Sequence, residues 1–215
     1  MRADDADLIL ELLNEPAFLQ NIGDRGVRNI ANACRYIVAA PVASYQQFGF
    51  GLYLVALKET AVPIGIRGLL KRESMKDIEV GFAFLERFWA MGYAYESAAV
   101  MDYARTSLGL KRIAATTAPG NRGSIRVLEK LGLRFEGRLR LPGQERETSL
   151  YALRANDARH SARILSLQRI QTRLLSRKAK PPLESQPQFL QHPDGAAISG
   201  CGRRRDALQP NEVRA

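Results

Sequence analysis

The chain has 215 residues and a mass of 23.9 kDa, and its 46% hydrophobic content can fill one sizeable core. No apolar run approaches the roughly 18 residues of a membrane-spanning helix, and the acidic start MRADDADLIL is unlike a signal peptide. Two cysteines and two histidines (Cys34, Cys201, His160 and His192) are too few and too scattered for a cysteine-rich zinc site or a histidine-ligated metal. We therefore expect no metal and a cytoplasmic protein.

The formal net charge of +10 is unevenly distributed along the chain. Residues 1–154 carry 21 Lys and Arg against 17 Asp and Glu, whereas residues 155–215 carry 11 against 5. More than half of the excess positive charge therefore lies in the last quarter of the sequence. An anionic partner, if the chain has one, is expected to meet this tail.

Hydrophobic periodicity predicts two helices at the start of the chain, over residues 5–14 and 26–40, with Pro41 ending the second and a short helical turn over 41–48. Strands are predicted over 51–57 and 64–70, joined as an antiparallel hairpin, and over 78–85 as an inner strand. A helix from Gly92 to Leu108, a strand over 112–118, a helix over 121–131 and strands over 133–138 and 148–153 follow. This order favours an α+β fold with a mixed sheet flanked by helices.

The pattern changes after Arg154. Residues 155–180 contain a basic amphipathic helix, with Ile164, Leu167 and Leu174 on one face and arginines on another. Residues 181–215 are rich in Pro, Gly and Gln without periodicity, and we expect them to be disordered. The predicted organisation is a globular domain over 1–154, followed by the helix and the tail.

The stretch 82–96 (FAFLERFWAMGYAYE) carries the strongest functional signal. A buried strand leads through the small-residue turn Ala90-Met91-Gly92 directly into a helix that has no capping Ser, Thr, Asn or Asp. Uncapped N–H groups at the positive end of a helix can bind a phosphate, although a tight turn also needs small residues for packing alone.

The run Trp89-Ala90-Met91-Gly92-Tyr93-Ala94 resembles the (Gln/Arg)-x-x-Gly-x-(Gly/Ala) signature of the GNAT superfamily of acetyl-CoA-dependent N-acetyltransferases. Together with Glu79-Val80-Gly81-Phe82 and the segment 121–132 (NRGSIRVLEKLG), it is similar to the subgroup that acetylates N-terminal amines of ribosomal proteins. The resemblance covers about residues 4–154 and implies a mostly antiparallel, twisted GNAT-like sheet. It also implies an acetyl-CoA site, in which the turn residues Trp89, Met91, Gly92, Tyr93 and Ala94 bind pyrophosphate, Phe82 and Phe84 pair with pantetheine, and Asn121 contacts the cofactor.

The chain departs from this family in three places. Trp89 replaces Gln or Arg, and Ala90 and Met91 replace a common Gly and a basic residue, which leaves backbone contacts to phosphate intact. Leu128 stands where many relatives have a Tyr that protonates the leaving thiolate, and the resembled subgroup has been assigned a Ser at the position of Ser124. The first edge strand of relatives is missing, so that strand is either absent or lost to a misplaced start codon.

Two residues are candidates for the chemistry of acetyl transfer to an amine. Glu79 is the candidate base, acting through water, with a solvent-facing strand carboxylate as the alternative. Ser124 is the candidate proton donor to the thiolate, with a small polar residue in the first helical turn as the alternative. Asn121 can cap its helix as well as contact the cofactor.

The acceptor is expected to be an α-amine or a small amine of low pKa, because roughly 10–17% of an α-amine is neutral at pH 7 against roughly 0.04% of a lysine amine. We therefore predict direct transfer of acetyl from acetyl-CoA to a primary amine, foremost a protein N-terminus, by a monomer or homodimer. The alternatives are an acetyltransferase for a small-molecule or antibiotic amine, and a non-catalytic acyl-CoA-binding module whose basic tail docks on RNA or another anionic surface.

Overall fold

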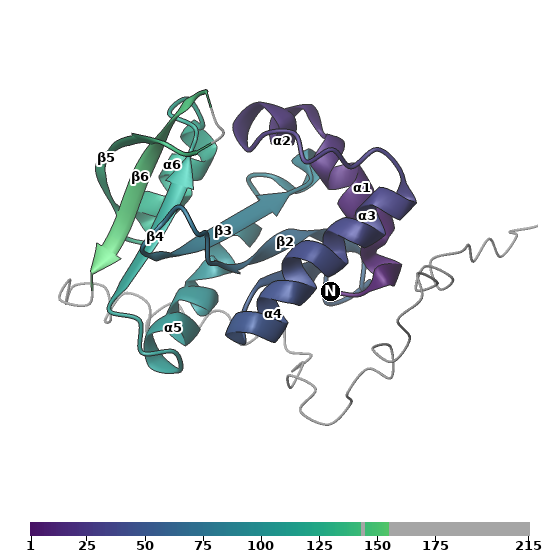
Figure 1. The fold of residues 1–215 in the computed structure, drawn as a ribbon, viewed down its shortest axis with the longest axis horizontal. Coiled ribbons are helices and arrows are strands. Elements are labelled where there is room, and N and C mark those ends of the chain that lie inside the picture. Colours follow the sequence, from purple (N-terminus) through teal and green to yellow (C-terminus); the bar gives the residue numbers. More distant parts are fainter. Residues whose placement is uncertain (143–144, 155–215) are drawn as a thin grey trace, which may run out of the picture.

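The computed structural model describes residues 1–142 and 145–154 (Figure 1). The predicted basic helix over 155–180 and the predicted tail over 181–215 lie outside the described residues. Within the described part, no helix combines the length and the apolar character needed to cross a lipid bilayer.

Helices precede the sheet and are then inserted between its later strands. The helices are α1 (Ala6–Asn14), α2 (Pro16–Asn21), α3 (Ile30–Ile37), α4 (Ala43–Phe48), α5 (Ala98–Thr106) and α6 (Arg122–Lys130). The strands are β1 (Leu52–Ala56), β2 (Pro63–Leu70), β3 (Ile78–Phe84), β4 (Arg112–Thr117), β5 (Arg134–Arg140) and β6 (Glu147–Arg154).

The six strands form one sheet in the order β1-β2-β3-β4-β6-β5. Four of the five strand pairs are antiparallel, and only β3 and β4 run parallel. The predicted α+β class, the β1–β2 hairpin and the inner position of β3 are confirmed. In the described residues no strand precedes α1, and β1 is the outer strand on its side of the sheet.

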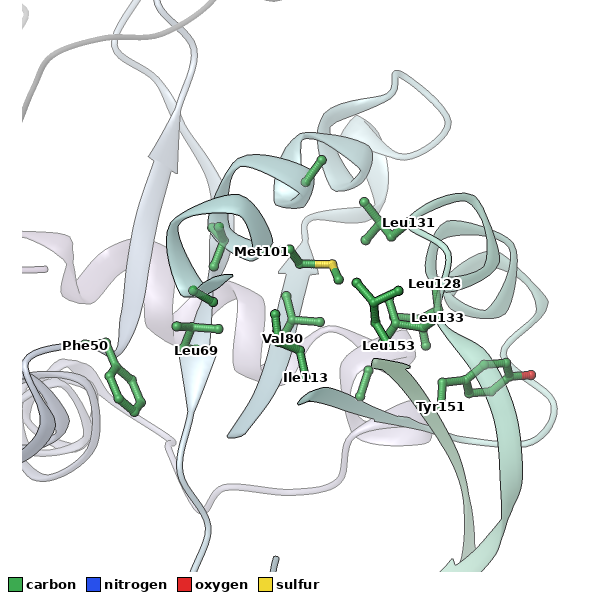
Figure 2. Packing of buried hydrophobic residues seen from close by; sticks show 14 residues of the cluster. Phe50, Leu69, Val80, Met101, Ile113, Leu128, Leu131, Leu133, Tyr151 and Leu153 are labelled. Atoms are coloured by element: carbon green, nitrogen blue, oxygen red, sulfur yellow. The ribbon is translucent and has the colours of Figure 1, made fainter. Parts of the chain in front are cut away.

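Helices cover both faces of the sheet, because side chains alternate between the faces along each strand. On one face, α5 and α6 bury Met101, Leu128 and Leu131 against Val80, Ile113 and Leu153 of the strands (Figure 2). On the other face, α1 and α3 lie side by side and pack against Leu52 and Ile66 (Figure 1). We call these the α5/α6 face and the α1/α3 face.

The helical boundaries differ from the predicted ones in two places. Pro41 does not end the second helix, because a π-helical turn over Val38–Val42 carries the chain from α3 into α4. The wider turn accommodates the proline, which has no N–H to donate and would clash in a regular α-helix. The short helix α2, which begins with Pro16 at its first position, was not predicted, since six residues are too few to show a helical period.

Candidate functional site

The parallel strands β3 and β4 separate soon after they begin. Their paired residues are Ile78 with Ile113 and Glu79 with Ala114, and no further pair follows. On its other edge β3 stays paired with β2 as far as Phe84. The remainder of β3 therefore has one edge without a neighbouring strand, facing a gap between β3 and β4.

The pairing with β2 identifies which peptide groups of β3 face this gap. The Leu85 N–H donates to the Ile64 carbonyl of β2 over 3.0 Å. Since successive peptide groups of a strand point to opposite edges, those of Val80, Phe82 and Phe84 point away from β2 and toward β4. The gap thus has a row of backbone donors and acceptors along one side, including both predicted pantetheine-binding residues, Phe82 and Phe84.

The turn after β3 leaves a series of backbone donors without acceptors. Ala90 and Gly92 both have positive φ, of 60° and 90°, and a 3₁₀ turn over Tyr93–Ser97 then leads into α5. No side chain caps this turn, and the N–H groups of residues 90–94 have no backbone acceptor in the described part of the chain. Met91 and Gly92 are exposed, so these N–H groups lie at the surface. The turn therefore has the free backbone donors that its sequence predicted.

Two contacts hold the turn against the sheet. The buried side chain of Phe84 packs against Tyr93 and Ala94. Glu96 on the 3₁₀ turn forms an ion pair with Arg67 on β2 at 3.4 Å, and both side chains are about 15% exposed. Burial raises the pKa of Glu96 and the Arg67 charge partly offsets this rise. This pair was not predicted, because its two residues are 29 positions apart and belong to no motif.

Trp89 adopts a position that the sequence did not indicate. Its side chain is half exposed, and the indole Nε1–H donates to the Phe84 carbonyl over 2.7 Å. This carbonyl is one of the groups that face the gap. The first residue of the signature-like run is therefore bonded to one of the two residues predicted to pair with pantetheine.

Glu79 is buried, with 1% of its surface exposed, so the alternative of a solvent-facing carboxylate is wrong. The Thr116 hydroxyl donates to Oε1 over 2.6 Å, and the Arg72 Nε lies 2.5 Å from Oε2 in an ion pair. The residue belongs to the last pair before β3 and β4 separate. Its alternation with Ala83 and Leu85 places the carboxylate on the α1/α3 face, at the point where the gap begins.

Asn121 and Ser124 lie at the start of α6, on the other face of the sheet. The Asn121 side chain accepts the Ser124 N–H over 3.0 Å, which confirms its role as a helix cap. The helix α6 contacts both β4 and the 3₁₀ turn that precedes α5. Ser124 is half-buried, and no contact in the described residues joins its hydroxyl to Glu79.

The arrangement therefore offers a linear binding surface with polar side chains near its inner end. Free N–H groups of the turn lie at one end, the unpaired edge of β3 continues inward, and Glu79 lies where the gap closes. Such a surface suits an extended molecule with an anionic end. Among the described residues, no group of three or more His, Cys, Asp or Glu side chains is arranged to hold a metal ion.

Comparison with known proteins agrees with this geometry. A family model described as an acetyltransferase (GNAT) domain matches residues 1–134. The protein YkkB of Bacillus subtilis is 34% identical over 96 residues, which cover 43% of this chain and 56% of YkkB. The N-acetyltransferase p20 of Bacillus licheniformis is 28% identical over 143 residues, or 65% of this chain and 79% of p20.

Solved structures share the fold at lower identity. A ribosomal-protein-S5-alanine acetyltransferase from Vibrio fischeri has a TM-score of 0.60 and 18% identity, covering 73% of this chain and 91% of that one. The aminoglycoside acetyltransferase AAC(6')-Ib, solved with coenzyme A, has a TM-score of 0.60 and 17% identity, covering 76% and 96%. Because the family model matches more than half of this chain, the chain belongs to the GNAT acetyltransferase family.

Proposed function

We propose that this protein transfers an acetyl group from acetyl-CoA directly to a primary amine, foremost the α-amine of a protein N-terminus. The observation that carries the proposal is the continuous surface formed by the free N–H groups of residues 90–94 and the unpaired edge of β3. The family to which the chain belongs is one of acetyltransferases. The backbone groups of this surface come from Phe82, Phe84 and the turn residues Met91 to Ala94.

The surface fits acetyl-CoA group by group. The N–H groups of Met91, Gly92, Tyr93 and Ala94 would bind the pyrophosphate, and the gap-facing peptide groups of Phe82 and Phe84 would pair with the two amides of pantetheine. Asn121 uses its carbonyl oxygen as the helix cap, so its amide N–H₂ is left for the cofactor. Bound in this way, acetyl-CoA supplies an activated thioester near Glu79.

Glu79 receives the proton of the attacking amine, through a water molecule. Its position at the closed end of the gap supports this role; the Thr116 hydroxyl hydrogen-bonds to Oε1, and Arg72 forms an ion pair with Oε2. The Arg72 guanidinium also keeps the buried carboxylate from being an uncompensated charge, which would destabilise the fold. Arg72 and Thr116 are thus positioning residues for the base.

Ser124 donates a proton to the departing thiolate of CoA from the other face of the sheet. Support comes from its place in the first turn of α6, a helix that contacts the 3₁₀ turn, and from its half-buried position. The two proton-transfer groups would then lie on opposite sides of the gap, so that one serves the acceptor and the other the leaving group. No cysteine or Ser–His pair of the described residues lies near the gap, which favours direct transfer without an acyl-enzyme.

Two observations favour an α-amine acceptor. A neutral amine is required for attack, and an α-amine supplies far more of it at pH 7 than a lysine does. In addition, the Arg72 charge balances Glu79, so this carboxylate is not available to attract a polycation. The structural likeness to a ribosomal-protein alanine acetyltransferase agrees with this choice.

A small-molecule amine is the second candidate acceptor, since the chain has an equal likeness to an aminoglycoside acetyltransferase. The two candidates are separated by measuring CoA release from acetyl-CoA with matched acceptors. The panel contains three kinds of acceptor. They are peptides with a free N-terminus, the same peptides with a blocked N-terminus and an internal lysine, and aminoglycosides. Release with only the free N-terminus supports the proposal, and release with only aminoglycosides contradicts it.

A further inference from the structure

The Phe84 carbonyl is a shared position on the edge of the gap. It points toward β4, away from β2, and it already accepts the Trp89 indole N–H over 2.7 Å. It is also the first gap-facing acceptor that an extended ligand meets after the free N–H groups of residues 90–94. A pantetheine amide that pairs with β3 at this point would donate to the same oxygen from the same side as the indole, so the two donors compete for the space in front of it.

The indole is held weakly in this position. Trp89 is 51% exposed, so about half of its surface makes no contact with the rest of the described protein. Its one described side-chain hydrogen bond is the bond to Phe84. Exchanging an indole donor for an amide donor conserves the number of hydrogen bonds, so displacement of the side chain has a small energetic cost.

We infer that Trp89 competes with the pantetheine arm for the Phe84 carbonyl, and that its indole must leave this carbonyl before an acyl-CoA can extend to Glu79. Trp89 thereby lowers the affinity for molecules that carry the arm, without affecting those that bind only at the turn. This inference rests on the proposed function, because it takes acetyl-CoA as the ligand of the gap.

The test compares two ligands and three proteins by calorimetry. Acetyl-CoA carries the pantetheine arm, whereas adenosine 3′,5′-bisphosphate has phosphates and no arm. Trp89→Phe keeps an aromatic ring but removes the N–H, and Tyr103→Phe on α5, also exposed, is the matched control. We expect Trp89→Phe to bind acetyl-CoA about two- to tenfold more tightly than wild type, and the bisphosphate equally well. Tyr103→Phe should leave both affinities unchanged.

A second readout follows the indole directly, because Trp89 is the only tryptophan of the chain. Its N–H gives a single indole resonance, and hydrogen exchange of this N–H should accelerate with acetyl-CoA but not with the bisphosphate. Weaker or unchanged binding of acetyl-CoA by Trp89→Phe, or an indole N–H that stays protected in the complex, would overturn the inference alone. Failure of wild type and Trp89→Phe alike to bind acetyl-CoA would overturn the proposed function, and this inference with it.

Discussion

Substituting Gly92 by glutamate should weaken binding of acetyl-CoA at least tenfold while leaving the fold intact. Gly92 lies between the free N–H groups of the turn, and a Cβ built on it would meet no atom within 4 Å. The new side chain therefore extends from the surface where the phosphates would bind, instead of into the core. Its φ of 90° strains any residue with a side chain, so strain has to be separated from charge.

The magnitude of the charge effect follows from Coulomb's law. A carboxylate about 5 Å from one phosphate charge costs roughly 0.8 kcal/mol in water and roughly 3 kcal/mol at the effective dielectric of a protein surface. With two pyrophosphate charges nearby, we expect the dissociation constant to rise at least tenfold. Backbone strain adds about 1–2 kcal/mol to the free energy of folding, which lowers the melting temperature with or without ligand.

Thermal unfolding with and without acetyl-CoA measures this effect. At 100 times the dissociation constant, a ligand stabilises the folded state by about 2.7 kcal/mol, or roughly 5–10 °C for a domain of this size. Gly92→Ala carries the strain without the charge and should retain most of the shift. Gly109→Glu adds the same charge at another positive-φ glycine with open space, and should retain all of it. A full ligand shift in Gly92→Glu would refute the site.

Glu79→Gln should lower kcat by roughly 10²–10⁴ with little change in acetyl-CoA affinity. The loss should shrink as pH rises, because more of the acceptor amine is already neutral. A kcat equal to that of wild type would show that Glu79 is not the base. Ser124→Ala should cause a smaller loss of kcat that persists at high pH. A rate that recovers at high pH would mean that Ser124 acts on the acceptor amine and not on the thiolate. Ala90→Gly should stabilise the fold by roughly 0.5–1 kcal/mol, since glycine relieves the positive φ of 60° at some entropic cost, and a lower melting temperature would contradict this. The Arg112 hydrogen bond holds the pKa of Glu136 below 4.5, so its stabilising effect is complete above that pH and is lost on acidification. Glu136→Gln should therefore lose less stability than wild type between about pH 6 and pH 3 in chemical denaturation, and an equal loss would show that the pair contributes nothing.

Much of the fold could be predicted because most of its elements carry strong local patterns. Ile9, Leu12 and Leu13 of α1 recur at helical spacing, and all three are buried. The wholly apolar end of the segment 78–85 predicted an inner strand, and β3 is paired with a strand on both sides at its start. The pattern of one segment does not, however, show how the neighbouring segments fold. Pro41 lies in a π-helical turn that lets the helix continue, and no residue type in the sequence predicts such a turn.

The turn was predictable for the same local reason, whereas its contacts were not. Small residues and the lack of a capping side chain indicated free N–H groups at 91–94, and the structure has them. The partners of Glu79 lie 7 and 37 positions away, in a loop and on β4. The hydrogen bond of Trp89 spans only five residues, but it depends on which edge of β3 the Phe84 carbonyl faces. That orientation requires the register of the sheet, which one sequence does not contain.

In the proposed function, acetyl-CoA binds along the turn and the unpaired edge of β3. Backbone amide resonances measured during a titration with acetyl-CoA test it directly, since each N–H reports on its own environment. Binding there should produce the largest shifts at Met91, Gly92, Tyr93 and Ala94 and at Phe82, whose N–H faces the gap. Saturable binding that leaves these five resonances unchanged and shifts others would contradict the account.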